Sequence, residues 1–196
     1  MKKVGVLGLQ GAVSEHIDKL GKFENIQPCV VKYKNEIEAI DALIIPGGES
    51  TAIGKLLVDF DLTDTLKSRI LAGMPVWGTC AGMIILAKKL CNDESRHLEV
   101  MDIEVMRNGY GRQLGSFSIT VNLPEISPNE IPLVFIRAPY VVDTAPNVEV
   151  LLRVNENIVA CRQENMLVTS FHPELTEDLS FHKYFVDMIK VNCDRS

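Results

Sequence analysis

Residues 4–90 alternate between short apolar runs and segments with helical spacing. The apolar runs end in glycine or other turn residues, and an amphipathic segment follows. Strands separated by helices in this way form right-handed βαβ units around a parallel sheet. We expect strands at 4–9, 27–33, 41–47 and 75–80, and helices at 12–23, 50–60 (capped by Ser50), 63–73 and 83–90.

The second half of the chain changes character. Strand-like runs separated by turns cover residues 98–107, 115–123, 133–139, 148–154, 157–163 and 166–171, and a helical pattern covers residues 180–192. Closely spaced strands of this kind pair antiparallel. The sequence therefore predicts an α/β fold with an open, mostly parallel sheet flanked by helices and an antiparallel β extension. Because there are no repeats and no linker-like stretches, we expect residues 1–196 to form a single domain.

Composition excludes several classes of protein. Hydrophobic residues make up 46% and charged residues 23%, and no apolar run reaches the roughly 18–20 residues that span a bilayer. A net charge of −6 argues against nucleic-acid binding, which needs a positive surface. The cysteines are scattered and contain no CxxC pair, which disfavours a metal site and fits a reducing compartment. The N-terminal run passes directly into polar residues, so we interpret it as a strand and expect a cytoplasmic protein without a membrane segment.

Three predicted strand ends are rich in glycine and functional groups: GLQGAV (8–13), PGGES (46–50) and GTCAG (78–82). In an open α/β sheet, ligands gather beyond the carboxyl ends of the strands. The phosphate-loop pattern GxxxxGK[ST] is absent, and the first glycines are spaced GxxGxxG, which gives little support to a dinucleotide site.

Cys80 lies between Gly78 and Gly82, after a predicted strand and before a helix. This has the form of a nucleophile elbow with cysteine in place of serine. The helix N-terminus would place partial positive charge beside the sulfur and favour the thiolate, while the Ala81 N–H would face a developing oxyanion. A buried structural cysteine at a tight turn would give the same local pattern, so both interpretations remain open.

His172 is the histidine best placed to act as a base. It follows the apolar run at residues 166–171, and Glu174 two residues later can accept a hydrogen bond from the imidazole. A cysteine nucleophile needs a base, and the base needs an orienting group. The other histidines, His16, His97 and His182, lie in helical or charged stretches and are expected to be helix-face or surface residues.

PGGES is compatible with a tight turn before a capped helix, and also with a backbone that approaches a ligand closely. Gln10 is polar at a strand end where a core residue would be ordinary. Neither feature decides on a function alone.

Taken together and in this order, PGGES, GTCAG and FHPE resemble the class I (triad) glutamine amidotransferases, whose glutaminase domain has a flavodoxin-like α/β fold. VGVLGLQGAVSEH, LIIPGGESTAIGKLL, RNGYGRQLGSF, FIRAP and SFHPELTED are similar to the branch formed by the glutaminase subunits of two-component pyridoxal 5′-phosphate synthases. The resemblance extends almost from end to end.

The resemblance implies a role for each matching position. Cys80 would form a γ-glutamyl thioester, His172 would act as base and then acid, and Glu174 would support it. The implied glutamine-binding and oxyanion positions, together with a position near the synthase contact, are Gly47, Gly48, Glu49, Ser50, Ala81, Arg107, Ile136, Arg137 and Gln10. A guanidinium is well suited to hold the α-carboxylate of glutamine.

The resemblance also implies a reaction and a partner. The chain would hydrolyse L-glutamine to L-glutamate and ammonia without a metal or cofactor. The ammonia would pass to a (β/α)₈-barrel synthase that makes pyridoxal 5′-phosphate from ribose 5-phosphate and glyceraldehyde 3-phosphate. We accordingly expect a hydrolase, and we also expect the chain to be classed as a lyase.

Three alternatives remain. The chain could be the glutaminase of another pathway, such as the partner of imidazole glycerol phosphate synthase. It could be a cysteine peptidase or thiol hydrolase on a related scaffold. It could also be a non-catalytic module in which Cys80 is a redox-sensitive thiol.

Overall fold

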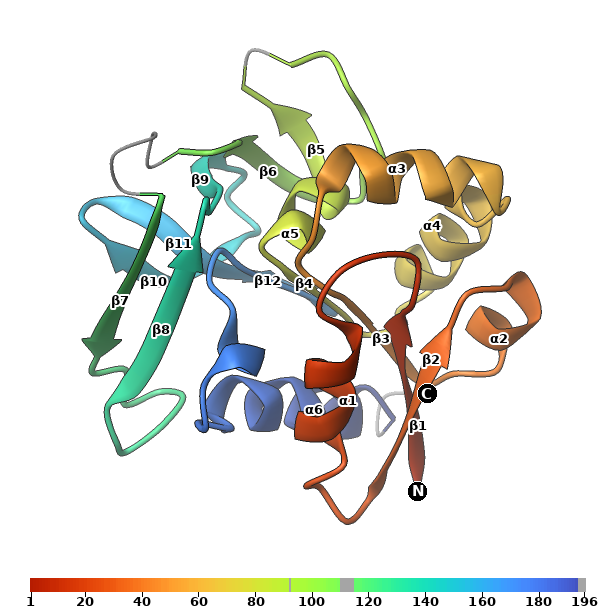
Figure 1. Ribbon diagram of the computed structural model, residues 1–196, viewed down its shortest axis with the longest axis horizontal. Coiled ribbons are helices and arrows are strands. Elements are labelled where there is room, and N and C mark those ends of the chain that lie inside the picture. Colours follow the sequence, from red (N-terminus) through yellow and green to blue (C-terminus); the bar gives the residue numbers. More distant parts are fainter. Residues whose placement is uncertain (92, 110–114, 194–196) are drawn as a thin grey trace.

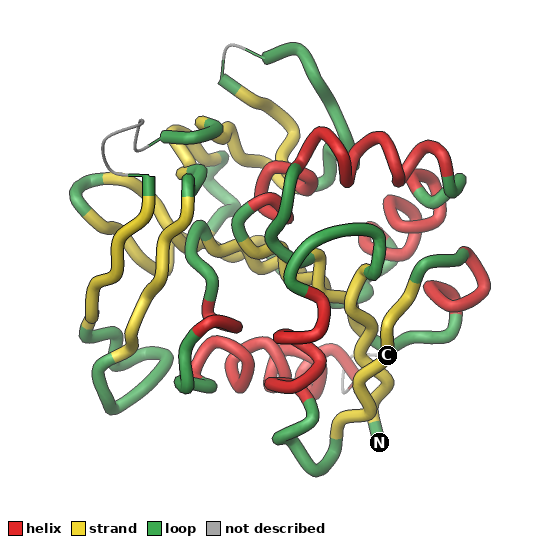
Figure 2. The backbone as a smooth tube through the Cα atoms, in the orientation of Figure 1, coloured by secondary structure: helices red, strands yellow, loops and turns green. Residues whose placement is uncertain are grey.

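The computed structural model describes residues 1–91, 93–109 and 115–193. Within them, a ten-stranded sheet has the order β2-β1-β3-β4-β12-β11-β9-β6-β5, with β10 paired to β11 (Figures 1 and 2). Its strands are β1 (Lys2–Leu7), β2 (Ile26–Val31), β3 (Ala42–Ile45), β4 (Val76–Thr79), β5 (Ala87–Leu90), β6 (Met101–Met106), β9 (Tyr140–Thr144), β10 (Glu149–Val154), β11 (Asn157–Gln163) and β12 (Met166–Thr169). A separate antiparallel pair consists of β7 (Ser116–Val121) and β8 (Ile131–Ile136).

Five neighbouring strands, β2, β1, β3, β4 and β12, run parallel, and β11 and β9 continue the sheet antiparallel. This is the mostly parallel sheet with an antiparallel extension that the sequence predicts. The helices are α1 (Val13–Leu20), α2 (Lys34–Glu38), α3 (Ser50–Asp59), α4 (Thr63–Leu71), α5 (Ala81–Leu86) and α6 (Ser180–Cys193), with a 3₁₀ turn η1 (Pro173–Leu175).

Helices cover both faces of the sheet (Figure 1). Neighbouring residues of β3 point to opposite faces: Leu43 and Ile45 join a core with α3, α4 and α5, whereas Ile44 joins a core with α1, α6 and the β7–β8 pair. A parallel strand buried on both faces reads as a continuous apolar run, which is why 41–47 is recognisable in the sequence.

The structure corrects the expected helix at residues 83–90. Helix α5 ends at Leu86, and Ala87–Leu90 form strand β5 with exposed Lys88 and Lys89. Strand β5 pairs in parallel with β6, and Ala87 lies opposite Met101. This pairing with β6, the next strand along the chain, overrides the local helical spacing.

Other local expectations also change. The N-cap of α3 is Glu49, whose side chain accepts a hydrogen bond from the Thr51 N–H, so the expected Ser50 cap is wrong and Ser50 is the first helical residue. Helix α2 and strand β9 have no counterpart in the sequence prediction.

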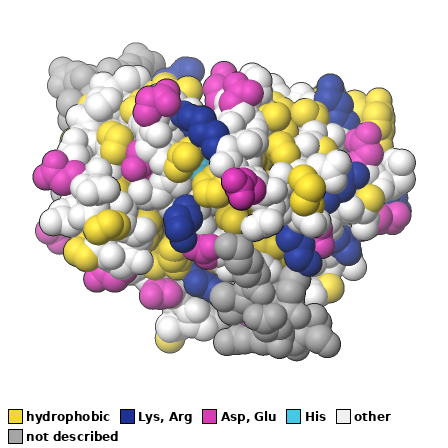
Figure 3. All heavy atoms as spheres, turned by 90° about the horizontal axis from the view of Figure 1, so that it is seen from below, with side chains coloured by type: hydrophobic (Ala, Val, Ile, Leu, Met, Phe, Trp, Pro, Cys, Tyr) yellow, Lys and Arg dark blue, Asp and Glu magenta, His cyan; other side chains and the backbone are white. Residues whose placement is uncertain are grey.

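The described residues contain no helix that is both long and apolar enough to cross a membrane. On the face of the molecule shown in Figure 3, acidic and basic side chains are interspersed among the described residues, which does not form the positive surface that nucleic acids require.

Candidate active site

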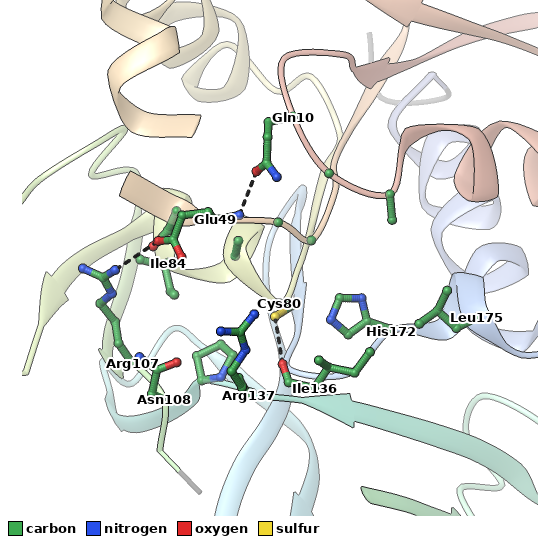
Figure 4. A pocket seen from close by; sticks show the side chains of 17 residues that line it. Gln10, Glu49, Cys80, Ile84, Arg107, Asn108, Ile136, Arg137, His172 and Leu175 are labelled. Atoms are coloured by element: carbon green, nitrogen blue, oxygen red, sulfur yellow. Dashed lines mark hydrogen bonds and ion pairs between the residues drawn. The ribbon is translucent and has the colours of Figure 1, made fainter. Parts of the chain in front are cut away.

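Four chain segments meet at one edge of the sheet. They follow β1, β3, β4 and β12, which are adjacent and parallel, so their carboxyl ends lie side by side. Together with residues at the ends of β6 and β8, these segments surround a pocket of about 460 Å³ (Figure 4), within the range of roughly 300–1,000 Å³ typical of small-molecule sites. The predicted site residues that line the pocket are Gln10, Gly47, Gly48, Glu49, Ser50, Cys80, Ala81, Arg107, Ile136, Arg137 and His172. Glu174 lies behind His172, outside the lining.

Cys80 occupies a strained turn between β4 and α5. Its φ is 47° and its ψ is −103°, in a region that residues other than glycine rarely adopt. A Cβ on Gly82 would lie 2.2 Å from the Ile45 carbonyl oxygen, so this crossing of chains requires glycine. The Cys80 N–H donates to the Thr169 carbonyl at 2.8 Å, and the sulfur lies 3.9 Å from the Ile136 carbonyl oxygen. The turn therefore presents the thiol to the pocket.

His172 joins the cysteine to Glu174. Its Nδ1 lies 2.7 Å from Glu174 Oε1, and its backbone N–H donates to the Val134 carbonyl at 2.8 Å, which anchors the turn to β8. Burial lowers the pKa of His172, but hydrogen bonds with Cys80 and Glu174 and the negative charge of both partners outweigh it and raise the pKa to about 10. The imidazole is therefore protonated at neutral pH and suited to stabilise a thiolate.

The glycine turn after β3 packs closely against His172 and Cys80. A Cβ on Gly47 would lie 2.4 Å from His172 Cε1, so no other residue fits there without movement. The Gly47 N–H donates to Thr79 Oγ1 at 3.0 Å, which leaves the Gly48 N–H as the candidate donor of this turn toward the pocket. Gln10 holds the turn from the other side, because its Oε1 accepts from the Glu49 N–H at 2.7 Å (Figure 4).

The two predicted arginines differ in their surroundings. Arg107 is engaged by carboxylates: its Nη1 lies 2.8 Å from Asp93 Oδ2 and its Nη2 lies 3.5 Å from Glu49 Oε1. Arg137, at a φ of 44°, lines the pocket and forms no ion pair with another described residue. Hydrogen bonds from Thr51, together with the nearby arginines, lower the pKa of Glu49, so the pocket rim holds a carboxylate and two guanidinium groups.

The other cysteines whose side chains are described do not share this setting. Burial raises the pKa of Cys161 to about 12, and burial likewise raises the pKa of Cys29 and of Cys91. All of them are free thiols. None of these three thiols lines the pocket, which leaves Cys80 as the candidate nucleophile there.

Sequence reasoning missed two histidines. His16 and His182 are expected at a helix face or at the surface, but both are fully buried behind Glu174. The sequence feature that could have shown His16 to be buried is its helical spacing, because His16 shares one face of α1 with Val13, Ile17 and Leu20. Residues 110–114 of the RNGYGRQLGSF segment lie outside the described residues.

An elbow cysteine beside a His–Glu pair, with a glycine turn opposite, is the arrangement that cysteine-dependent acyl transfer on an α/β sheet requires. Residues 6–191 match the model of the SNO glutamine amidotransferase family, and the chain belongs to that family. It is 75% identical to "Pyridoxal 5'-phosphate synthase subunit PdxT" of Ruminiclostridium cellulolyticum, over 96% of this chain and 100% of that protein. The protein of the same description from Clostridium botulinum is 57% identical, over 95% of this chain and 97% of that protein.

Solved structures agree with this assignment. A crystal structure described as a glutamine amidotransferase is 41% identical and superposes with a TM-score of 0.89, covering 95% of this chain and 98% of that chain. PurLQS from Thermotoga maritima shares the fold at 15% identity, with a TM-score of 0.66 and coverage of 98% and 97%.

One expectation is wrong. The family and its members support a glutamine-hydrolysing amidotransferase and give no support to a lyase. The physical reason is that hydrolysis of the glutamine side-chain amide transfers an acyl group to water, which is not an elimination.

Proposed function

We propose that this chain is the glutaminase subunit of a pyridoxal 5′-phosphate synthase and that Cys80, His172 and Glu174 are its catalytic triad. The observation that carries the proposal is the strained Cys80 turn joined to His172, which Glu174 Oε1 holds at 2.7 Å. The match to the family over residues 6–191 supports glutamine as the substrate. Residues 1–196 act as a single glutaminase domain.

Glutamine binds with its side-chain amide toward Cys80. The Arg137 guanidinium, which forms no ion pair with another described residue, binds the α-carboxylate, and Arg107 stays near it while holding Glu49. The Glu49 carboxylate faces the α-ammonium group. The Arg137 guanidinium suits the α-carboxylate because a planar guanidinium donates two parallel hydrogen bonds to a carboxylate. Gly47, Gly48, Ser50 and Ile136 complete the pocket wall.

The Cys80 thiolate attacks the amide carbon and forms a tetrahedral intermediate. The N–H groups of Gly48 and Ala81 donate to its oxyanion, and one such donor contributes about 3–4 kcal/mol to the transition state. Protonated His172 gives its proton to the departing nitrogen, and ammonia leaves. Water, activated by the now neutral His172, attacks the thioester and releases glutamate and the Cys80 thiolate.

The ammonia passes to a (β/α)₈-barrel synthase subunit, which combines it with ribose 5-phosphate and glyceraldehyde 3-phosphate. Gln10 links the segment after β1 to the glycine turn through the Glu49 N–H, so a partner that contacts this segment can adjust the oxyanion hole. We infer that the partner activates hydrolysis in this way. Free thiols scattered through the chain suit the cytoplasm, where we place the protein.

The test is ammonia release from L-glutamine by the purified chain, alone and with the barrel synthase. Cys80→Ala removes the nucleophile, and Cys161→Ala is the matched control because it removes a buried thiol that does not line the pocket. We expect hydrolysis that rises with the synthase, disappears in Cys80→Ala and persists in Cys161→Ala. Cleavage of peptides but not of glutamine, or unchanged activity in Cys80→Ala, would show that the proposal is wrong.

A further inference from the structure

Two histidines form a buried polar pair directly behind the proposed triad. His16 on α1 and His182 on α6 are both fully buried, and His16 Nδ1 lies 3.1 Å from His182 Nε2. Trp77 packs edge-on against both imidazoles, with ring centroids 5.7 Å and 5.0 Å away. Buried polar groups cost free energy unless they are paired, so a pair of histidines in an aromatic core calls for a reason beyond packing.

The pair reaches the triad through Glu174. Glu174 Oε1 is bonded to His172, whereas Oε2 is buried and has no hydrogen bond within the described residues. His16 Nε2 lies 3.4 Å from this Oε2 and 3.3 Å from Thr79 Oγ1. One ring N–H of His16 is therefore placed between the free oxygen of the carboxylate and a hydroxyl group.

The same contacts tie His16 to the glycine turn. Thr79 Oγ1 accepts the Gly47 N–H at 3.0 Å and also lies within hydrogen-bond distance of His16 Nε2. His16 thus contacts, directly or through one hydroxyl, both the carboxylate behind the base and the turn proposed to form the oxyanion hole.

The charge state of the pair follows from its burial. Burial lowers the pKa of His182 to about 3, helped by the Lys19 charge, and burial also lowers the pKa of His16 well below its usual value. Both rings are therefore neutral at pH 7, and each has one N–H donor and one acceptor nitrogen.

Two arrangements of these protons let the rings hydrogen-bond to each other, and one of them fits the surroundings better. If His16 Nδ1 donated to His182, the His182 Nδ1–H would be a buried donor without a partner, because that atom has none within the described residues. The bare His16 Nε2 would then face the Glu174 carboxylate, lone pair against lone pair. In the opposite arrangement His182 Nε2–H donates to His16 Nδ1, and His16 Nε2–H faces Glu174 Oε2 and Thr79 Oγ1. Orphaned N–H groups are rarer than orphaned acceptors, which favours this arrangement.

We propose that His16 and His182 are positioning residues that extend the triad: His182 orients His16, and His16 directs its Nε2–H toward Glu174 and so fixes the carboxylate that holds His172. This inference rests on the proposed glutaminase function. Neither histidine contacts the substrate pocket, so both act on the chemical step through Glu174 and not on substrate binding.

The kinetic test uses glutamine hydrolysis by the complex with the synthase. His16→Leu and His182→Leu remove the donors at similar volume, whereas His16→Gln keeps an amide N–H near the position of Nε2. Phe185→Leu is the matched control, because Phe185 packs on Trp77 in the same core and lies outside the polar chain. We expect kcat to fall about tenfold or more in both histidine-to-leucine variants with KM within about twofold, and His16→Gln to stay within about threefold of wild type.

The control separates positioning from packing. Melting temperatures are measured for all variants, and a Phe185→Leu protein as destabilised as His16→Leu but with normal kcat excludes a general loss of packing. If His16→Leu and Phe185→Leu have equal kcat, the positioning role is wrong although the glutaminase function stands. If the wild-type complex itself does not hydrolyse glutamine, the proposed function fails instead.

A second measurement reads the protons directly. In the full chain labelled with ¹⁵N-histidine, ring nitrogen shifts distinguish the two neutral tautomers, and the variants above assign His16 and His182. We expect both rings to be neutral and protonated at Nε2 at pH 7. An Nδ1-protonated His16 would overturn the assignment, and so would a charged one.

Discussion

The setting of His172 makes a prediction whose sign is fixed by the structure. Burial lowers the pKa of this imidazole, and the Cys80 and Glu174 partners raise it to a net value of about 10. A rise from the unperturbed value near 6.5 corresponds to roughly 5 kcal/mol of preferential stabilisation of the imidazolium. Removing both partners leaves burial as the main influence. We therefore expect the pKa to fall below 6.5 in the double variant Cys80→Ala/Glu174→Leu.

The assay is an NMR titration of the His172 ring in three proteins. The Cys80→Ala variant retains the Glu174 carboxylate, so the pKa of His172 in this variant should lie between 6.5 and about 10. Cys80→Ala/Glu174→Gln keeps an oxygen acceptor without the charge and should titrate lower still. The leucine double variant should titrate lowest. His172→Gln, made in the same background, assigns the signal.

The pH dependence of the free energy of unfolding should follow from the direction in which the His172 pKa is shifted in each variant. In Cys80→Ala the folded pKa is raised, so the contribution of His172 to the free energy of unfolding is full below about pH 6.5 and is lost as the pH rises through the folded pKa. In the leucine double variant the folded pKa is lowered, so the contribution is present above about pH 6.5 and is lost as the pH falls. Urea unfolding from pH 5 to 9 measures both trends. A pKa that stays above 6.5 without either partner would falsify the reasoning.

Three further predictions concern single residues. Gly47→Ala should lower kcat for glutamine hydrolysis by about 100-fold or more, because the added Cβ would lie 2.4 Å from His172 Cε1. Gly21→Ala is the control: its Cβ would meet no atom closer than 3.4 Å, so glutamine hydrolysis should be unchanged. Arg137→Ala should raise KM for glutamine about tenfold or more with a smaller effect on kcat, since a charge-assisted pair to the substrate is lost; an unchanged KM in steady-state assays would remove Arg137 from the carboxylate site. Asn165→Ala should lower the free energy of unfolding by about 2–3 kcal/mol without changing kcat, because the buried Nδ2 donates to two backbone carbonyls at 2.9 Å and 2.7 Å; urea unfolding checks this, and a loss under 1 kcal/mol would contradict it.

Much of the fold was predictable because local patterns of apolar and turn residues indicate its strands and helices. Apolar runs such as 41–47 that end in glycine predict parallel strands, and the structure has them at β1, β3 and β4. The exceptions depend on pairing with other strands. Residues 87–90 have helical spacing but pair with β6, and the missed strand β9 lies between β6 and β11. Strand pairing is a contact with another segment, so it leaves no reliable trace in the local residue pattern.

The candidate site divides in the same way. Its reactive groups stand at strand ends, so Cys80, His172 and the PGGES turn are recognisable from residue type and position. Their meeting depends on the sheet order, which places β1, β3, β4 and β12 next to one another although β12 is the last strand of the chain. Only the structure distinguishes the interactions of Arg107 from those of Arg137, because the Asp93 carboxylate that pairs with Arg107 comes from a different loop.

By itself, the sequence determined the α/β class, the elbow at Cys80, the His172–Glu174 unit and the likeness to glutamine amidotransferases. Only the tertiary structure decided that His16 and His182 lie behind Glu174, because they belong to helices near opposite ends of the chain that pack on the same face of the sheet. Helical periodicity can show that a histidine faces the core. Which carboxylate it meets there is set by packing between distant segments, and that arrangement exists only once the chain has folded.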